Sequence, residues 1–203
     1  MRCPRASATP AYARAIIGEI GTSNPVHARE EKVLRAAARV SARTGVAVTL
    51  HTDPTGRLAL DVLDILEAEG ADPARVVVGH MDGELDDGFL EYHRRIVERG
   101  AYIAYDTFGE ENCYANGLTN GKSFWCPSDK QRINAVLAAP EAGYGDRLLL
   151  SQDVCMKMSH EKYGGFGYGH LLKNIVPELR SEGVSQAELD QLLVDNPRKM
   201  LAH

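Results

Sequence analysis

Cysteine is scarce in this sequence and is never paired at short spacing. The four cysteines are Cys3, Cys113, Cys126 and Cys155, and no C-x-x-C occurs. This spacing suits a reducing cytosol better than a disulfide scaffold or a cysteine-based zinc site. We therefore expect free thiols.

Long apolar runs and blocks of basic residues are also missing. No run approaches the roughly 18 apolar residues that span a bilayer, and the N-terminus lacks the apolar stretch of a secretory signal. A formal net charge of -5 without a basic block gives no reason to expect nucleic acid or a membrane as partner. We expect a cytoplasmic protein in which residues 1–14 are irregular or disordered and residues 15–203 form one globular unit.

Five short apolar segments are present, and each ends at a residue that can bind a metal or carry a proton. The segments 15–18, 46–50, 76–79, 102–105 and 148–152 are followed by Glu19, His51, His80, Asp106 and Asp153. Brief apolar runs rich in β-branched residues, separated by helical stretches, are typical of buried parallel strands. Functional groups in such folds gather at the carboxyl ends of the strands. The pattern therefore predicts one shared site at that rim.

Between the strand segments, apolar residues recur at the spacing of a helix. Residues 30–44, 57–69, 86–99 and 129–139 have this pattern, and a glycine follows each of the first three, at Gly45, Gly70 and Gly100. The repeated order predicts right-handed β/α units, and thus an α/β fold with a parallel sheet covered by helices. Residues 108–127 are expected to form a long loop at the wall of a pocket, and the glycine-rich residues 164–169 a flexible lid.

The polar strand endings favour a metal site. His51 and His80 end successive strands, so their imidazoles are expected at the same rim, close enough to share one divalent cation. Glu19 on the neighbouring strand can bridge two metals. Asp153 can bind the second metal and accept a proton from its water. The chemistry implied is hydrolysis.

Each of these residues also has a structural interpretation, and the spacing leaves both open. A single histidine at a strand end is more often a hydrogen-bonded structural residue, while Glu19 could form a salt bridge and Asp153 could cap the following loop. Asp106 could serve only to order the rim.

The remaining histidines are expected to play lesser parts. His93 faces an apolar helix stripe and is predicted to lie in the core, whereas His170 begins a helix beside the glycines and could touch substrate. The others, expected to be exposed, are His27, His160 and His203.

Seven stretches resemble the phosphotriesterase-related branch of the amidohydrolase superfamily. They are IIGEIGTS, TGVAVTLHT, RVVVGHMD, YDTFG, LLLSQDVCMK, YGGFGYGHLL and DNPRKML. The resemblance implies a (β/α)8 TIM barrel with two metals, commonly zinc, in which His51 and His80 bind one metal, Glu19 bridges the two, and Asp153 ligates the other. It also implies that Asp153 takes the proton of a hydroxide that attacks a small-molecule substrate.

The sequence departs from that family in two respects. No His-x-His occurs, so one of the two metals could be lost, and Thr107 follows Asp106 where phosphotriesterases have a histidine. The second departure favours an ester, lactone or amide over an organophosphate. A complete barrel needs about 250 residues.

We therefore expect the C-terminal portion of a barrel, about five β/α units, from an N-terminally truncated gene product. Such a chain is expected to be a homo-oligomer or to be completed by another polypeptide. Two functions remain open at this point: a metal-dependent hydrolase, and a catalytically impaired remnant that binds at most one metal.

Overall fold

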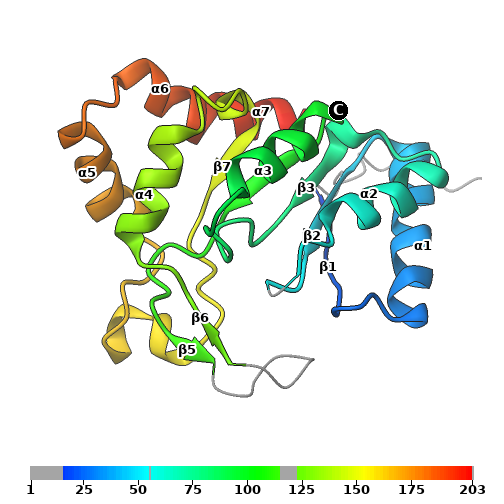
Figure 1. Ribbon diagram of the computed structural model, residues 1–203, viewed down its shortest axis with the longest axis horizontal. Helices are drawn as coiled ribbons and strands as arrows, with labels where there is room; N and C mark the ends of the chain where they lie inside the picture. The colour runs from blue at the N-terminus through cyan, green and yellow to red at the C-terminus, as the bar shows by residue number, and fades with distance from the viewer. Residues whose placement is uncertain (1–15, 55, 115–122, 203) are drawn as a thin grey trace, which may run out of the picture.

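The computed structural model describes residues 16–54, 56–114 and 123–202, and its centre is a five-stranded parallel sheet (Figure 1). The strands are β1 (Ile16–Gly21), β2 (Ala47–His51), β3 (Val76–Val78), β4 (Tyr102–Tyr105) and β7 (Leu148–Leu150), and they lie side by side in that order. All four neighbouring pairs are parallel. The expected α/β class and parallel sheet are therefore confirmed. The expectation of an eight-stranded barrel stays a prediction.

Helices connect the strands and continue to the C-terminus. The helices between strands are α1 (Ala28–Thr44), α2 (Ala59–Ala68), α3 (Phe89–Glu98) and α4 (Asp129–Ala138), and the C-terminal helices are α5 (Val176–Ser181), α6 (Gln186–Asp190) and α7 (Asn196–Leu201). Local capping sets the limits of α1, because the ring of His27 accepts a hydrogen bond from the N–H of Arg29 and Gly45 adopts a φ of 73° at the other end.

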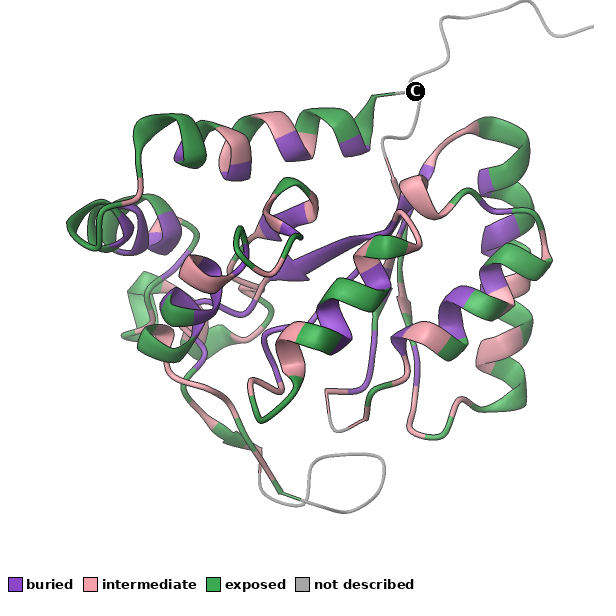
Figure 2. Cartoon of the chain, turned by 45° about the horizontal axis from the view of Figure 1, so that its top comes forward, coloured by how far each residue is buried: buried purple, intermediate pink, exposed green. Residues whose placement is uncertain are grey.

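Side chains alternate between the two faces of the sheet. One face packs against the helices, and its buried residues include Val48, Leu50, Val76, Val78, Ile103, Tyr105 and Leu148. The opposite face carries Ala47, Val77, Tyr102, Ala104 and Leu149. Figure 2 shows the helices buried on the side that meets the sheet and exposed on the other. Apart from β1, whose residues are exposed or partly buried, most strand residues are buried and apolar, and the polar groups of interest lie near the carboxyl ends of the strands.

The structure differs from the sequence-based expectation in its boundaries and in one added element. β1 continues two residues past Glu19, and its pairing with β2 is irregular between Ile17 and Ile20. The expected loop 108–127 contains an antiparallel ribbon of β5 (Cys113–Tyr114) and β6 (Phe124–Trp125). Residues 1–15, 55, 115–122 and 203 lie outside the described part, so the expectation for residues 1–14 stays a prediction.

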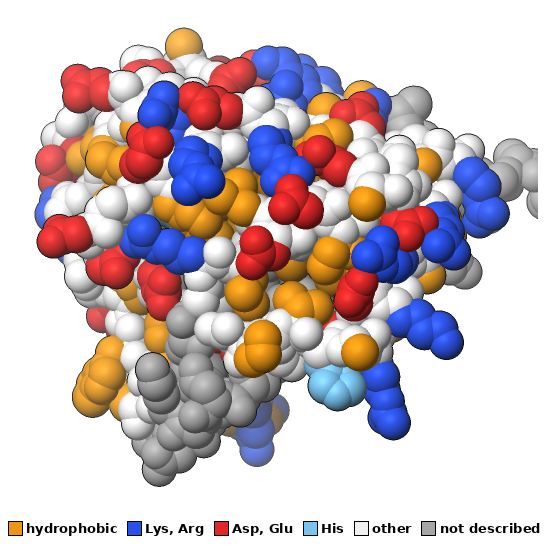
Figure 3. All heavy atoms as spheres, turned by 45° about the vertical axis from the view of Figure 1, so that its right-hand side comes forward, with side chains coloured by type: hydrophobic (Ala, Val, Ile, Leu, Met, Phe, Trp, Pro, Cys, Tyr) orange, Lys and Arg blue, Asp and Glu red, His pale blue; other side chains and the backbone are white. Residues whose placement is uncertain are grey.

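Charged side chains of both signs are mixed on the face that Figure 3 shows. On α1, for example, Arg35 pairs with Glu31 at 2.6 Å and with Glu69 at 2.8 Å. Mixed charge of this kind gives that face no single-sign field for a polyanion. None of the helices within the described residues is long and apolar enough to cross a membrane.

Candidate metal centre

Three predicted ligands meet at the carboxyl ends of β1, β2 and β3. The Nε2 of His80 lies 2.8 Å from the Nδ1 of His51, which in turn lies 3.4 Å from Oε2 of Glu19. The distance from Nε2 of His80 to Oε1 of Glu19 is 4.0 Å. His80 is buried, whereas about half of the His51 side chain is exposed. The three groups therefore line an open rim that a cation can reach from solvent.

The arrangement fits a small divalent cation in its donor types and nearly in its spacing. Two imidazole nitrogens and a carboxylate oxygen are common zinc ligands, and bonds of 2.0–2.1 Å in a tetrahedron place donor atoms about 3.3 Å apart. The separations of 3.4 Å and 4.0 Å suit this geometry. The 2.8 Å contact of the two imidazoles is a hydrogen bond. These rings must therefore separate by about 0.5 Å and give up the shared proton when a cation binds.

Asp106 orients the buried histidine. Its Oδ1 accepts a hydrogen bond from the backbone N–H of His80 at 2.9 Å and lies 3.0 Å from Nδ1 of the ring. Burial alone lowers the pKa of His80, but the hydrogen bond and charge of Asp106, helped by Glu19, outweigh it and raise that pKa to about 9. With Nδ1 directed at Asp106, Nε2 faces the rim, which is the usual arrangement of a metal-binding histidine and its carboxylate partner. Asp106 therefore does order the rim.

Asp153, the fourth predicted ligand, lies in a second group with Glu110 and Cys155. Their ligand atoms are within 4.8 Å of one another, and this group does not include Glu19 or the two histidines. Burial, reinforced by the charges of Asp153 and Glu110, raises the pKa of the Cys155 thiol to about 11. A thiol with so high a pKa is a poor nucleophile, which disfavours cysteine-based catalysis here.

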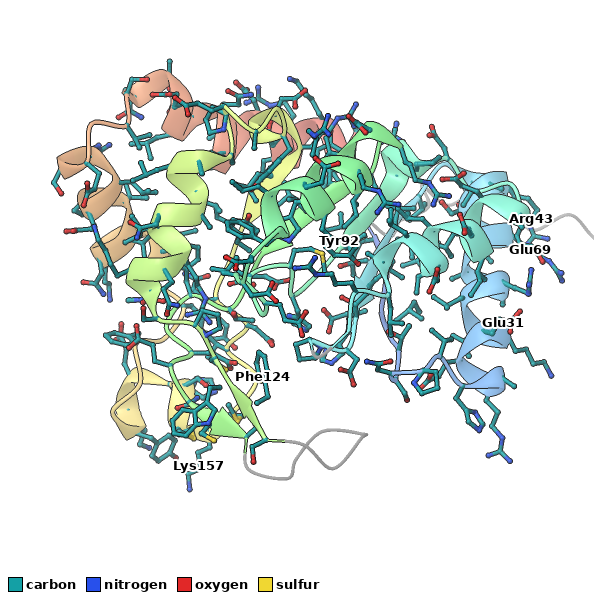
Figure 4. The ribbon with its side chains drawn as sticks, in the orientation of Figure 1. Glu31, Arg43, Glu69, Tyr92, Phe124 and Lys157 are labelled. Atoms are coloured by element: carbon teal, nitrogen blue, oxygen red, sulfur yellow. The ribbon has the colours of Figure 1, made fainter. Side chains whose placement is uncertain are left out.

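A cavity of about 270 Å³ is lined by the two histidines of the first group and by all three residues of the second. His51, His80 and Asp153 line it on the sheet side, and Phe124 of β6 and Met156 lie on its wall. Figure 4 shows Phe124 on the ribbon of β5 and β6, below the strand ends, with Lys157 pointing away from the body of the protein. None of the described residues that line the cavity is a lysine or an arginine. The part of the wall that Phe124 and Met156 form suits an apolar group.

His80 and Asp153 share an unusual backbone conformation. Among the described residues they are the two non-glycine residues with positive φ, 58° for His80 and 41° for Asp153. A side chain in this region costs of order 1–3 kcal/mol, and such residues cluster at functional sites. The strain is therefore located at two of the four predicted ligands.

The other histidines mostly lie as expected. His93 is 1% exposed, and its Nδ1 lies 2.9 Å from the hydroxyl oxygen of Tyr105. His27 is exposed, His160 is partly buried, and His203 lies outside the described residues. His170 is 3% exposed and is not among the residues that line the cavity, so its expected contact with substrate has no support in this geometry.

Sequence reasoning missed a set of polar residues behind the rim. Glu110 is buried, and the hydroxyl of Tyr114 donates to its Oε2 at 3.1 Å. Arg132 and Asp82 form a wholly buried ion pair at 2.8 Å. The sequence offered one signal for this set, which is that Asp82 lies two residues after His80, where a strand ends. Among the cysteines, Cys113, Cys126 and Cys155 are free as expected, and Cys3 lies outside the described residues.

Residues 9–201 of the chain match the model of the phosphotriesterase family. Among curated proteins, the chain is similar to the N-acetyltaurine hydrolase of Danio rerio, with 37% identity over 194 residues, and to that of Homo sapiens, with 36% identity over 188 residues. In both cases the match covers 92% of this chain and 52% of the relative. The chain thus spans about half the length of the curated relatives it matches.

Two solved structures show the same fold. A resiniferatoxin-binding protein from Rhodobacter sphaeroides has 41% identity and a TM-score of 0.84, over 92% of this chain and 50% of its own. A phosphotriesterase homology protein from Escherichia coli, complexed with phosphate in its active site, has 34% identity and a TM-score of 0.78, over 92% of this chain and 59% of its own.

Proposed function

This chain belongs to the phosphotriesterase family, and we propose that it carries a metal-binding rim of a metal-dependent hydrolase that acts on a small molecule. The observation that carries the proposal is the convergence of Glu19, His51 and His80, whose ligand atoms lie within 4.8 Å of one another. We further propose that the five parallel strands are part of a (β/α)8 barrel, because the relatives are about twice as long as this chain.

In this proposal Glu19, His51 and His80 hold the cation, and zinc best fits the two imidazoles and the carboxylate. A bound divalent cation supplies Lewis acidity and makes a water molecule acidic enough to lose its proton near neutral pH. The absence of His-x-His leaves this chain without the pair of imidazoles that the family uses for a second metal.

The protein residues have separate tasks around that chemistry. Asp106 holds the ring of His80 so that Nε2 faces the rim, and the carboxylate of Asp153 takes up a proton at the opposite side of the same cavity. Glu110, which is buried beside Asp153, adds a second carboxyl group to that side of the cavity. The proposed role of Asp153 as a metal ligand requires it to approach the other three residues.

The proposed bond is a carboxylic amide, ester or lactone. Relatives that carry the name N-acetyltaurine hydrolase cleave an amide by that name, which supports an acyl substrate here. Thr107 stands after Asp106, and it offers no imidazole for the proton relay of phosphotriesterases. The apolar side chains of Phe124 and Met156 on the cavity wall favour an uncharged group on the substrate.

Metal analysis combined with a substrate panel tests the proposal. The purified chain is loaded with zinc, dialysed, and assayed for bound metal and for hydrolysis of N-acyl amides, esters and lactones. We expect close to one equivalent of zinc and turnover of at least one substrate class. His51→Ala and His80→Ala should each lower the zinc content.

The matched control is His27→Asn. It removes an imidazole from the start of α1 but keeps a side chain that can cap the helix, so its zinc content should equal that of the wild type. Zinc content that is the same in all four proteins would refute the assigned ligands. Bound zinc without turnover of any substrate would leave a cation-binding protein and overturn the hydrolase.

A further inference from the structure

Arg132 is a wholly buried arginine in α4, with 0% of its surface exposed. Burying a guanidinium costs several kcal/mol unless its donors are all paired. Helix α4 otherwise packs through apolar residues such as Ile133 and Val136. The guanidinium instead extends to the segments that follow β3 and β4, which are the segments that carry His80 and Asp106.

The guanidinium makes four hydrogen bonds, three to those segments and one to Asp129 at the start of α4. Its Nε donates to Oδ2 of Asp82 at 2.8 Å, and its Nη1 donates to Oδ1 of Asp129 at 3.1 Å. Its Nη2 donates to the hydroxyl of Thr107 and to the carbonyl of Glu110, each at 2.9 Å. The planar fork of an arginine can satisfy this many acceptors at once, whereas a lysine cannot.

Asp82 carries the connection onward to Asp106. Its Oδ2 accepts hydrogen bonds from the N–H and the hydroxyl of Thr107, at 3.1 Å and 2.8 Å, and its Oδ1 lies 3.3 Å from the N–H of Asp106. The backbone that directs the Asp106 carboxylate at His80 is therefore fixed by a side chain from the neighbouring strand end. Asp82 is 0% exposed, so its buried carboxylate depends on Arg132 as its charged partner.

His170, which follows the glycine-rich segment, is connected to Arg132 through Asp129. Asp129 accepts a hydrogen bond from the N–H of Gly109 at 2.8 Å, and its second oxygen lies 2.6 Å from Nε2 of His170. The ring of Phe166 stacks on that of His170 with centroids 4.1 Å apart. The motif around His170 thus contacts the rim through Asp129 and Arg132, although it does not line the cavity.

We propose that Arg132 is a positioning residue for the candidate metal centre, which it serves by fixing Asp82 and, through Asp82, the backbone that aims Asp106 at His80. The proposal rests on the proposed function, because it assigns Arg132 to the binding of the same cation. The proposal also assigns a role to His170, because its ring contacts Asp129, and Asp129 accepts a further hydrogen bond from the guanidinium.

Cobalt binding and nuclear magnetic resonance of the His80 ring test this proposal together. The chain is titrated with Co²⁺, whose visible absorption reports the geometry of its ligands, and the metal-free chain is examined for the His80 ring N–H that is hydrogen-bonded to Asp106. Arg132→Met should weaken Co²⁺ binding by about 10- to 100-fold, alter the absorption, and broaden or remove the ring N–H signal. Arg132→Lys should lie between Arg132→Met and the wild type.

Asn196→Ala is the matched control for a loss of stability alone. Asn196 is also 0% exposed, and its side chain donates to the carbonyls of Gly145 and Leu148 at the amino end of β7, far along the strand from the rim. We expect this variant to unfold more easily and to keep the Co²⁺ affinity, the absorption and the ring N–H signal of the wild type.

Thr107→Val provides a milder test if Arg132→Met does not fold. It removes the hydroxyl that joins Asp82 to Arg132 and keeps both charges, and a loss of several-fold in Co²⁺ affinity is expected. The proposal is overturned if a folded Arg132 variant keeps the Co²⁺ affinity, the absorption and the ring N–H signal of the wild type. If neither Arg132 variant folds, the same result for Thr107→Val overturns it. A wild-type chain that binds no Co²⁺ would overturn the proposed function instead, and the ring N–H signal would still decide the role of Arg132.

Discussion

A single oxygen of Asp106 accepts the backbone N–H of His80 at 2.9 Å and also lies 3.0 Å from the Nδ1 of the same residue. Two contacts to one residue fix both the path of the chain after β3 and the plane of the ring. Rotation of the imidazole would break the ring contact and leave a buried carboxylate short of a donor. The direction of Nε2 is therefore a property of the pair of residues.

Asp106→Asn should lower the pKa of His80. The carboxylate holds that pKa at about 9, and when its charge is removed the burial of the ring favours the neutral form, so the pKa should fall to 6.5 or below. A titration of the His80 ring signals in the metal-free protein measures the change. Asp86→Asn removes an exposed carboxylate that pairs with Arg57 and should leave the His80 titration unchanged. A His80 pKa near 9 in Asp106→Asn would contradict the assigned cause.

Asp153→Asn should retain metal and lose rate. The residue lies outside the group formed by Glu19, His51 and His80, so most of the zinc should remain, while the amide cannot take up a proton. We expect kcat to fall by about 10²- to 10⁴-fold on the best substrate of the panel. Steady-state kinetics with parallel metal analysis checks this. A loss of zinc as large as that of His51→Ala would instead make Asp153 a principal ligand.

Gly79→Ala should destabilise the fold. A Cβ at this position would lie 2.5 Å from the carbonyl oxygen of Leu50 and 3.0 Å from Oδ2 of Asp106, so the backbone or the carboxylate must move. Overpacking of this kind costs about 1–3 kcal/mol. In the control Gly21→Ala the new Cβ meets nothing within 4 Å, and the free energy of unfolding should stay within about 0.5 kcal/mol of the wild type. Urea denaturation of the two variants measures the contrast, and equal stability would disprove the crowding.

His93 should make the protein less stable in mild acid. Burial lowers the pKa of His93 to about 3, while the unfolded chain binds the proton near pH 6.5. Between these two pH values the unfolded state binds one more proton than the folded state. The stability that the protein gains from a neutral, buried His93 is therefore complete above pH 6.5. It is lost at up to about 1.4 kcal/mol per pH unit as the pH falls toward 3.

His93→Gln removes that titration and can keep a hydrogen bond to Tyr105. Its free energy of unfolding should depend less steeply on pH than that of the wild type between about pH 6 and 4, as measured by urea denaturation at each pH. Parallel profiles for the two proteins would mean that His93 is not held neutral.

Phe124→Ala should weaken the binding of apolar substrates. Loss of the ring from the cavity wall removes about 1–2 kcal/mol of apolar contact, which corresponds to a rise in KM of roughly tenfold for a substrate with a long acyl chain. For a substrate with a short acetyl group, both kcat and KM should change little. Trp125→Ala, at the adjacent and 75% exposed position, is the control and should alter neither constant. An equal effect on acetyl and long-chain substrates would remove Phe124 from the acyl-binding wall.

The sequence pattern predicted the sheet and three members of the rim for a simple physical reason. Parallel strands end at one edge, so the residues after consecutive apolar runs must come together, as His51 and His80 do at 2.8 Å. The irregular pairing of β1 beside Glu19 could not be predicted, because a bulge depends on the neighbouring strand.

Residues brought together from distant segments were not predictable. Arg132 and Asp82 are fifty positions apart, and an arginine among other polar residues at the start of a helix has the pattern of a solvent-exposed one. The strand order likewise separates Asp153 from the group around Glu19, because β1 and β7 lie at opposite edges of the sheet, and the run of apolar residues before Asp153 does not encode that order.

The left-handed backbone conformation of His80 and Asp153 costs stability at two positions whose side chains the proposed chemistry uses. Glycine adopts such a conformation without steric cost, whereas a side chain there strains the backbone by about 1–3 kcal/mol. A selection of variants for heat resistance can thus favour glycine at Asp153 and remove its carboxylate, whereas at His80 the same exchange would also leave Asp106 without its ring donor.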